Sequence, residues 1–527
     1  MTVGNSLLSI IAYARSGALD HAWRLFREAG FDRIDNDPAV LSVRGRLLKD
    51  SALGASGEER KKRYLEAADA YARAAEIGGA TYPLINAATL SLLAGRAEQA
   101  RKLAQRVLER IAQGGDEPET PYYRAATEAE ALLVLGRVTK AQEALSAAIA
   151  LAPQAFEDHA STLRQFGLIL RALGRDESWL NKMRPPRSLH FAGHMMLAAD
   201  DAALAARIRE VIGSERIGFG FGALAAGADI LIAEALLEAG AELHIVLPAP
   251  VFRFREISVA RFGESWLARF DRLREGARSI RSIEAVTDPL SPLALRLAAE
   301  IAMGKAAMQA DTLMTEALQL LIVDQDASAK PAGGSGWIGE TWENGGRRQH
   351  VLPAQRVLPP KPVLASVADP SDCLAAMLRI ELGAETVSEA LANLAHILAQ
   401  APQPVVPPRW TGEALLVAFD TTSQAAEVAL LAAQTLGDAQ ALRIAGHYAP
   451  ARRASDPFSG SSFLVGRAPA QLAAIAGTTP SGAIHVSEDF AATLHINSRV
   501  IGRRTEYVGE LPETDREEPL QLFCLKR

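Results

Sequence analysis

The sequence predicts a multidomain protein with three fold classes in order: an all-α helical-repeat solenoid, an α/β Rossmann-like domain with a parallel sheet, and an α+β domain. Helical pairs separated by glycines recur in the first third, strands alternate with helices in the middle, and mixed strands and helices follow a proline-rich stretch. We place the domains at residues 1–183, 184–356 and 365–527, with a linker at 357–364.

The composition is that of a globular protein and disfavours several classes of partner. Hydrophobic residues make up 49% of the chain and charged residues 22%, as in core-forming proteins. The net charge of −6 includes no long basic run, so we expect no nucleic-acid partner. The amino terminus lacks the basic region of a signal peptide, and no window of about 18 residues is apolar throughout. We therefore expect a cytoplasmic protein without a membrane partner.

Four glycines occupy the same place in four helical segments of the first domain: Gly17, Gly95, Gly136 and Gly174. The last three recur at intervals of about 40 residues, which is typical of helical repeats. A glycine between two helices supplies a left-handed turn, and small residues such as Ala100 and Ala104 let the helices approach closely. The pattern resembles tetratricopeptide repeats. Two readings stay open: a concave groove for a partner protein, or a helical cap on the next domain.

In the second domain, apolar runs at 188–193, 216–221, 243–248 and 318–325 alternate with helical patterns. This alternation predicts a parallel sheet covered by helices on both faces. Ligands of such sheets bind outside the carboxyl ends of the strands, where glycines let backbone amides approach an anion. The candidate ligand-binding residues are Gly193, His194, Gly222, Gly227, Asp229, Glu234, Gly333, Gly334, Ser335 and Glu340.

Three of these candidates also have structural interpretations. Asp229 is equally explained as an acid that favours the first turn of its helix through the helix dipole. Glu234 lies on a mostly apolar helix, where solvent exposure and a buried pair both stay open. His194 follows a strand end, where a histidine is more often structural than catalytic.

The order of these motifs resembles the SLOG superfamily. The resemblance rests on G-A-L-A-A-G-A-D at 222–229, A-E-A-L-L-E-A-G at 233–240, V-L-P at 246–248 and G-G-S-G at 333–336. It implies a nucleotide or nucleotide-derived ligand. The nucleotide phosphoribohydrolases of this superfamily carry a P-G-G-x-G-T-x-x-E loop, but here Trp337 replaces the threonine and Glu340 comes one place late. The resemblance therefore implies ligand binding more than hydrolysis.

In the third domain, residues 363–378 are expected to form a strand and then a helix. The stretches R-I-A-G-H-Y-A-P at 443–450, S-G-A-I-H-V-S at 481–487 and E-Y-V-G at 506–509 resemble the class III adenylate/guanylate cyclase catalytic domain. That resemblance implies that Asp369 and Glu413 are vestigial metal ligands, and that Mg²⁺ is required only if the domain is active.

The cyclase resemblance also implies an inactive domain. Ala470 and Ala474 occupy the positions of the family's asparagine and arginine, and alanine cannot stabilise the charge that develops in the transition state. We therefore assign no catalytic residue and expect a pseudo-cyclase. The family's sites form between two such domains, so a homo-oligomer is expected.

Together these features favour a cytoplasmic signalling or antiphage-defence protein that binds a nucleotide-type small molecule. Two enzyme hypotheses remain as alternatives. One is a nucleotide N-glycosidase that uses Glu340 or Glu234 as its acid/base. The other is a weakly active cyclase that uses Asp369 and Glu413.

Overall fold

The computed structural model describes residues 3–114, 120–283, 290–324, 334–357, 369–382, 387–412, 414–436, 442–512 and 519–527. The chain divides into two compact units. The first comprises Met1–Pro185 with Thr312–Met314, and the second comprises Pro186–Asp311 with Thr315–Arg527. Within the described residues, no helix combines the length and apolar character that crossing a membrane requires. The predicted multidomain organisation, with helical repeats and a parallel sheet, is confirmed.

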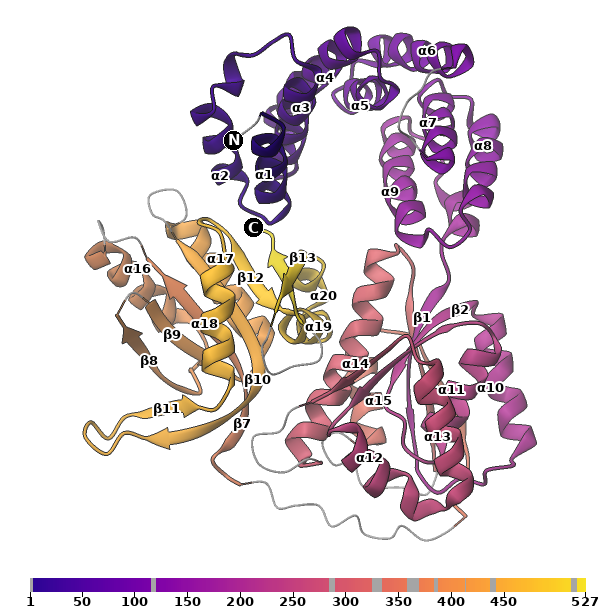
Figure 1. Ribbon diagram of the computed structural model, residues 1–527, viewed down its shortest axis with the longest axis vertical. Helices are drawn as coiled ribbons and strands as arrows, with labels where there is room; N and C mark the ends of the chain where they lie inside the picture. Colours follow the sequence, from indigo (N-terminus) through magenta and orange to yellow (C-terminus); the bar gives the residue numbers. More distant parts are fainter. Residues whose placement is uncertain are drawn as a thin grey trace. The chain divides into compact units, whose positions relative to one another are not determined.

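The first unit is a series of antiparallel helices that pack against their neighbours along the chain (Figure 1). Gly17, Gly95, Gly136 and Gly174 have φ angles of 82°, 85°, 75° and 61°, so each supplies the expected left-handed turn. The helices are α1 (Val3–Arg15), α2 (Leu19–Glu28), α3 (Pro38–Leu53), α4 (Gly57–Gly78), α5 (Thr81–Leu93), α6 (Ala97–Gln113), α7 (Pro121–Val134), α8 (Val138–Leu151) and α9 (Phe156–Ala172).

The second unit begins with a parallel sheet of strand order β4-β3-β2-β1-β5-β6. Each neighbouring pair is parallel. The chain builds outward from β1 on one side and from β5 on the other, so the order reverses between these two strands. The strands are β1 (Arg187–Gly193), β2 (Ile217–Gly222), β3 (Glu242–Leu247), β4 (Ser279–Ser282), β5 (Ala317–Val323) and β6 (Gln349–Pro353).

Helices cover both faces of this sheet because alternate strand residues are apolar on both sides. Leu189, Phe191 and Ile245 pack with α10 (Ala202–Ser214), α11 (Ala228–Glu238) and α13 (Glu264–Gly276). On the opposite face, Val246 packs with α14 (Pro292–Thr312), and His190 stacks on Trp342 of α15 (Ser335–Asn344). A short helix, α12 (Val251–Ser258), follows β3.

A second, mixed sheet has the order β13-β14-β12-β10-β7-β9-β8, with β11 paired to β10. The β10–β12 pair is parallel and the other pairs are antiparallel. The strands are β7 (Asp372–Glu381), β8 (Val406–Thr411), β9 (Ala414–Phe419), β10 (Arg443–Ser455), β11 (Ser462–Val465), β12 (Ile484–Ser487), β13 (Thr505–Leu511) and β14 (Leu520–Leu525).

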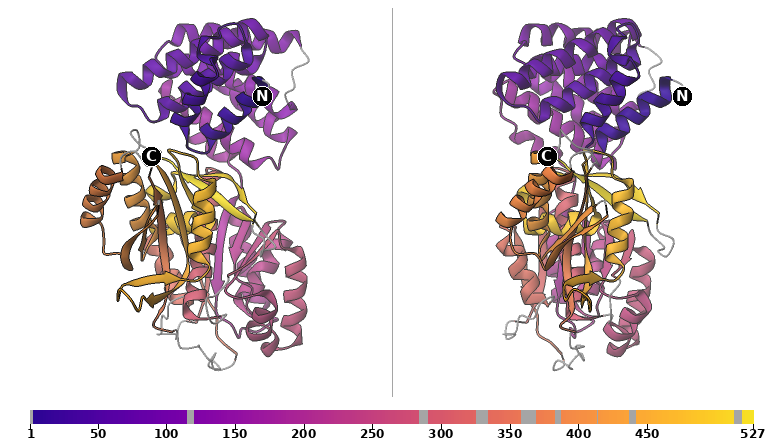
Figure 2. Two further views of the ribbon diagram at one scale, coloured as in Figure 1. Left: turned by 60° about the vertical axis from the view of Figure 1, so that its left-hand side comes forward. Right: turned by 90° about the vertical axis from the view of Figure 1, so that its left-hand side faces the viewer.

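The helices of the mixed sheet lie on two sides (Figure 2, orange and yellow). The faces follow from the two clusters of buried residues. Leu374, Leu378 and Tyr448 pack with α16 (Val387–Gln400), α17 (Thr422–Leu436) and α19 (Glu488–Asn497), whereas Met377 and Ala445 pack with α18 (Ala468–Thr478). A short helix, α20 (Arg499–Gly502), follows α19.

The expected helix after residue 370 is wrong. The stretch Cys373-Leu-Ala-Ala-Met-Leu forms the first part of β7. Alanine, leucine and methionine favour a helix intrinsically, but pairing with β9 and β10 and burial on both faces outweigh that preference. The predicted linker at 357–364 lies outside the described residues except for Val357.

The two sheets of the second unit share one hydrophobic core through α14. Leu297 and Ile301 of α14 belong to the same buried cluster as Phe490 and Leu494 of α19. At Gly304 the two helices approach so closely that an added Cβ would lie 2.1 Å from the carbonyl oxygen of Ala492. The parallel and mixed sheets therefore fold as one body.

Charged side chains reinforce the same contact. Arg281 at the end of β4 donates to Glu488 at 2.5 Å and to Asp489 at 2.7 Å. Lys305 of α14 pairs with Glu488 at 2.7 Å. The cations hold the pKa of the Glu488 carboxyl below its ordinary value, although burial acts in the opposite direction.

Candidate functional site

Three polar side chains meet where the strand order reverses. His194 follows β1, Asp324 follows β5, and Arg356 follows β6. Arg356 Nε donates to His194 Nδ1 at 2.8 Å and lies 4.0 Å from a carboxylate oxygen of Asp324. Because carboxyl ends of parallel strands share one edge, these residues mark the position where such sheets bind ligands. We call His194, Asp324 and Arg356 the edge cluster.

The backbone after β6 is tied across this edge. The Ala354 amide donates to the Val323 carbonyl at 3.0 Å, and the Val357 amide donates to the Met196 carbonyl at 2.9 Å. These two bonds fix the segment on either side of Arg356 to the end of β5 and to the loop after β1. The Arg356 side chain is thus held over the edge by main-chain contacts.

His194 is a neutral imidazole in this arrangement. The residue is 8% exposed. Burial lowers its pKa, the Arg356 charge lowers it further, and Asp324 acts in the opposite direction. A neutral ring can accept at Nδ1, which is the atom that receives the Arg356 bond.

Asp229 anchors the loops after β1 and β2. It is 6% exposed and accepts a hydrogen bond from the Ala225 amide at 3.1 Å. Burial raises the pKa of this carboxyl to about 7, while hydrogen bonds from the backbone of Ala225 and Gly193 oppose the rise. The buried Asp229 carboxyl therefore takes the position at the start of α11 that would otherwise favour the anion of a ligand.

The glycines at this edge serve close packing. An added Cβ would lie 2.4 Å from the Ala228 Cβ at Gly193, and 2.5 Å from the Phe191 carbonyl oxygen at Gly222. Gly227 has φ of 119°, and its Cβ would lie 2.6 Å from the His194 carbonyl oxygen. These positions exclude larger residues for steric reasons alone.

The loop between β2 and α11 uses several of its own amides. Ala225 donates to Asp229, Ala226 donates to the Ser258 carbonyl, and Ala228 donates to the His194 carbonyl. Those three amides are therefore not available to a ligand phosphate. A phosphate at this edge would need other donors.

The second glycine-rich turn is only partly described. Gly334 is the N-cap of α15 and Ser335 is its first residue, both half-buried. Glu340 is exposed on the same helix. Gly333 lies outside the described residues. Because β5 and β6 are parallel, α15 must begin at the edge that carries the edge cluster.

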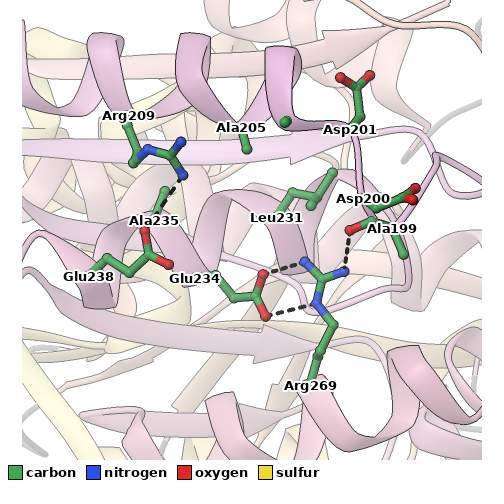
Figure 3. A pocket seen from close by; sticks show the side chains of 11 residues that line it. Ala199, Asp200, Asp201, Ala205, Arg209, Leu231, Glu234, Ala235, Glu238 and Arg269 are labelled. Atoms are coloured by element: carbon green, nitrogen blue, oxygen red, sulfur yellow. Dashed lines mark hydrogen bonds and ion pairs between the residues drawn. The ribbon is translucent and has the colours of Figure 1, made fainter.

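Glu234 lies elsewhere, in a pocket between the loop after β1 and helices α10, α11 and α13 (Figure 3). Its carboxylate accepts from Arg269 Nε at 2.8 Å and from Arg272 at 3.0 Å. Arg269 also donates to the Ala199 carbonyl at 3.0 Å, and Arg209 pairs with Glu238 at 3.8 Å. Two ion pairs, Arg269–Glu234 and Arg209–Glu238, thus line this pocket together with Asp200 and Asp201, and the edge cluster is not part of its lining.

In the mixed sheet, Asp369 lies just before β7. It pairs with Arg452 at 3.2 Å and accepts from the Ser371 amide at 2.9 Å. Ala414, the first residue of β9, pairs with Glu381 at the far end of β7. Nine residue steps of extended strand separate those ends by roughly 30 Å. Asp369 is therefore not placed beside the start of β9, as a shared metal site would need.

Glu413, the second expected ligand, lies outside the described residues. Within the part of the chain that the structure describes, no cluster of three or more histidine, cysteine or acidic side chains could hold a metal ion. Asp369 is explained by its pair with Arg452, and the role of Mg²⁺ stays a prediction.

Sequence reasoning missed Arg356 as a site residue. The surrounding prolines gave the segment after residue 350 the composition of a linker, so no ligand role was expected there. One signal could have found it: His194, Asp324 and Arg356 each follow shortly after the end of a parallel strand. Residues at such positions approach one another whatever their separation in sequence.

The helical repeats match a known family. Residues 6–91 match the family described as Tetratricopeptide Repeats-Sensor. This confirms the repeat type over α1 to α5. No curated protein matches the chain.

Part of the chain is similar to solved cyclase domains. One is the guanylate cyclase domain of RhGC from Catenaria anguillulae in complex with GTP, at 14% identity and a TM-score of 0.25, covering 29% of this chain and 97% of that one. A second is the adenylyl cyclase CyaB from P. aeruginosa, at 12% identity and a TM-score of 0.24, covering 30% and 95%.

A third is a non-canonical dimeric guanylyl cyclase domain of the RhoGC fusion protein from Blastocladiella emersonii. It has 16% identity and a TM-score of 0.23, and the match covers 29% of this chain and 97% of that one. The expected likeness to adenylate and guanylate cyclase domains is thus found for part of the chain. The resemblance of the parallel-sheet domain to the SLOG superfamily stays a prediction.

Proposed function

We propose that this chain is a signalling protein that binds a nucleotide-derived ligand at the edge cluster. The observation that carries the proposal is the convergence of His194, Asp324 and Arg356 at the reversal point of a parallel sheet. Open α/β sheets bind ligands at this point because the loops diverge there and leave a crevice.

The chemistry of the edge cluster suits a nucleotide. A guanidinium matches the oxygens of a phosphate, and a carboxylate such as that of Asp324 accepts hydrogen bonds from ribose hydroxyls. The SLOG-like motifs at 222–229 and 333–336 favour the same class of ligand. The family matched by the repeats is described as a sensor, which agrees with a regulatory role.

The proposal favours binding over hydrolysis. The Glu234 carboxylate is held by Arg269 and Arg272, so it is poorly placed to act as an acid/base on a ligand at the strand edge. Glu340 is exposed on α15, and Trp337 stands where the hydrolase loop has threonine. We also propose that the signalling function serves antiphage defence.

Assembly into a homo-oligomer is the second part of the proposal. The α19 side of the mixed sheet is covered by α14 of the same chain. A second copy would therefore have to use another surface, such as the side that carries α18, or the helical repeats.

The test is an incubation of the purified chain with labelled nucleoside monophosphates, NAD and ATP, followed by melting curves and product analysis. We expect a ligand-induced rise in melting temperature without ribose-phosphate or cyclic-nucleotide products. Ribose-phosphate release would support the N-glycosidase instead, and a cyclic product would support the cyclase. No melting shift and no product with any probe would contradict the proposal.

A further inference from the structure

We propose that Arg356 is the phosphate-binding residue of this site and that His194 is a positioning residue that presents its guanidinium. The inference rests on the proposed function and deepens it, because it names the group of the ligand that the site recognises. It assigns a role to Arg356, which lies directly before the predicted linker and for which the sequence predicts no function.

Arg356 is paired more weakly than Arg255 and Arg452 of the same unit. Arg255 makes two hydrogen bonds to Asp271, at 3.0 and 2.7 Å, and Arg452 makes two to Asp372, at 2.8 and 3.3 Å. Among the residues that the structure describes, Arg356 contacts the neutral ring of His194 and one carboxylate oxygen at 4.0 Å. Its fork of N–H donors thus lacks the bidentate oxyanion that suits it best.

The position of Arg356 is fixed while its charge stays accessible. The flanking backbone is bonded to the end of β5 and to the loop after β1, which holds the start of the side chain in place. The Arg356 side chain is 25% exposed, whereas His194 is buried. A partly exposed, preorganised guanidinium can take up a phosphate without a loss of buried pairing.

The His194 contact explains how the guanidinium is oriented. The neutral Nδ1 accepts from Arg356 Nε, and Arg356 Nη2 lies 2.5 Å from the same atom. An acceptor without charge orients the guanidinium but does not neutralise it. The Asp324 carboxylate at 4.0 Å offsets part of the positive charge, and the guanidinium can still bind the phosphate of a nucleotide.

The experiment compares phosphorylated and unphosphorylated probes on the full-length chain. The probes are AMP, GMP, CMP and UMP with their four nucleosides, and the readout is the dissociation constant. We expect wild type to bind at least one monophosphate about tenfold or more tightly than its nucleoside, as a charged hydrogen bond implies. Arg356→Gln should remove most of that preference and leave nucleoside affinity within about threefold.

Matched variants separate recognition from folding. Arg209→Gln changes an arginine of the pocket in Figure 3 and should keep the preference for the monophosphate. His194→Asn retains an acceptor oxygen near the place of Nδ1 and should keep most of the preference, whereas His194→Ala should weaken it. If Arg356→Gln fails to fold, Arg356→Lys keeps a charge without the fork and should give an intermediate preference.

Each outcome decides between the two proposals. A folded Arg356→Gln variant with an undiminished preference overturns the inference and leaves the proposed function intact. If wild type binds monophosphates and nucleosides equally well, the inference is likewise overturned and the proposed function stands. If Arg209→Gln loses the preference for the monophosphate and Arg356→Gln keeps it, the phosphate binds in the pocket of Figure 3 and the inference is overturned. Failure of wild type to bind any probe contradicts the proposed function, and the inference falls with it.

Discussion

Asp229 is the residue at which the fold of the site depends most directly on pH. Its pKa is raised from 3.8 to about 7 by burial, so between those values the folded state holds a proton that the unfolded state has released. Raising the pH through this window therefore lowers the free energy of unfolding, and the loss is complete above about pH 7. Asparagine cannot ionise, so Asp229→Asn should escape this loss.

The measurement is the melting temperature of wild type and Asp229→Asn at pH 5 and pH 8. We expect the variant to gain at least about 4 °C relative to wild type over this range, because each pKa unit corresponds to about 1.4 kcal/mol. Other titrating groups cancel in the comparison. A difference that stays constant with pH would show that the Asp229 carboxyl is ionised in the folded protein.

The residues of the site differ in how far the sequence could predict them. Gly193 and His194 lie at the end of β1, where the apolar run at 188–193 placed them, and Asp229 lies in the first turn of its helix as expected. Their role in ligand binding stays a prediction. Glu234 lies about two turns into α11, where its direction depends on Arg269 of another helix. Arg356 was missed because the prolines around it resemble a linker, and only its place shortly after a strand end indicates that it lies near His194.

At the scale of elements, the contact between α14 and α19 has no tolerance for an added methyl group. Gly304→Ala would place a Cβ 2.1 Å from the Ala492 carbonyl oxygen, and the backbone cannot move aside cheaply. We expect a loss of about 1–3 kcal/mol in the free energy of unfolding. Urea denaturation of the full chain measures it.

Gly213 of α10 is the matched control, because an added Cβ there meets no atom within 4 Å. Gly213→Ala should be neutral or stabilise by up to about 1 kcal/mol, since alanine favours helices. Equal effects of the two substitutions would show that the helices do not pack as closely as described.

The elements themselves were predicted well where buried strands alternate with helices. The expected strands at 188–193, 216–221 and 243–248 agree with β1, β2 and β3 within a residue or so at each end. The expectation failed at β7, whose alanines and leucines favour a helix locally. There the pairing of distant strands decides the structure, and one sequence contains no direct signal of it.

At the scale of the whole molecule, the sequence suggests independent sheet domains, but the second unit has one core. Leu297 and Ile301 of α14 are buried among residues of the mixed-sheet domain. The cluster of Arg281, Lys305, Glu488 and Asp489 adds buried charges that would lose their partners on separation. Unpaired buried charges are strongly unfavourable.

We therefore expect a fragment of residues 186–356 to be much less stable than a fragment of 186–527. The shorter fragment exposes the apolar side of α14 to water and should aggregate or melt early. Size-exclusion chromatography and melting curves of both fragments measure this. A monomeric 186–356 fragment that melts at the temperature of the longer one would show that the two sheets fold independently.

The central claim is that a nucleotide binds at the edge cluster of the parallel sheet and not in the mixed-sheet domain. Hydrogen–deuterium exchange of the full chain, with and without the nucleoside monophosphate that binds best, tests it most directly. We predict slower exchange in peptides that cover residues 194–201, 223–229 and 354–357. Protection confined to the mixed-sheet strands, with no change in these three segments, would contradict the account.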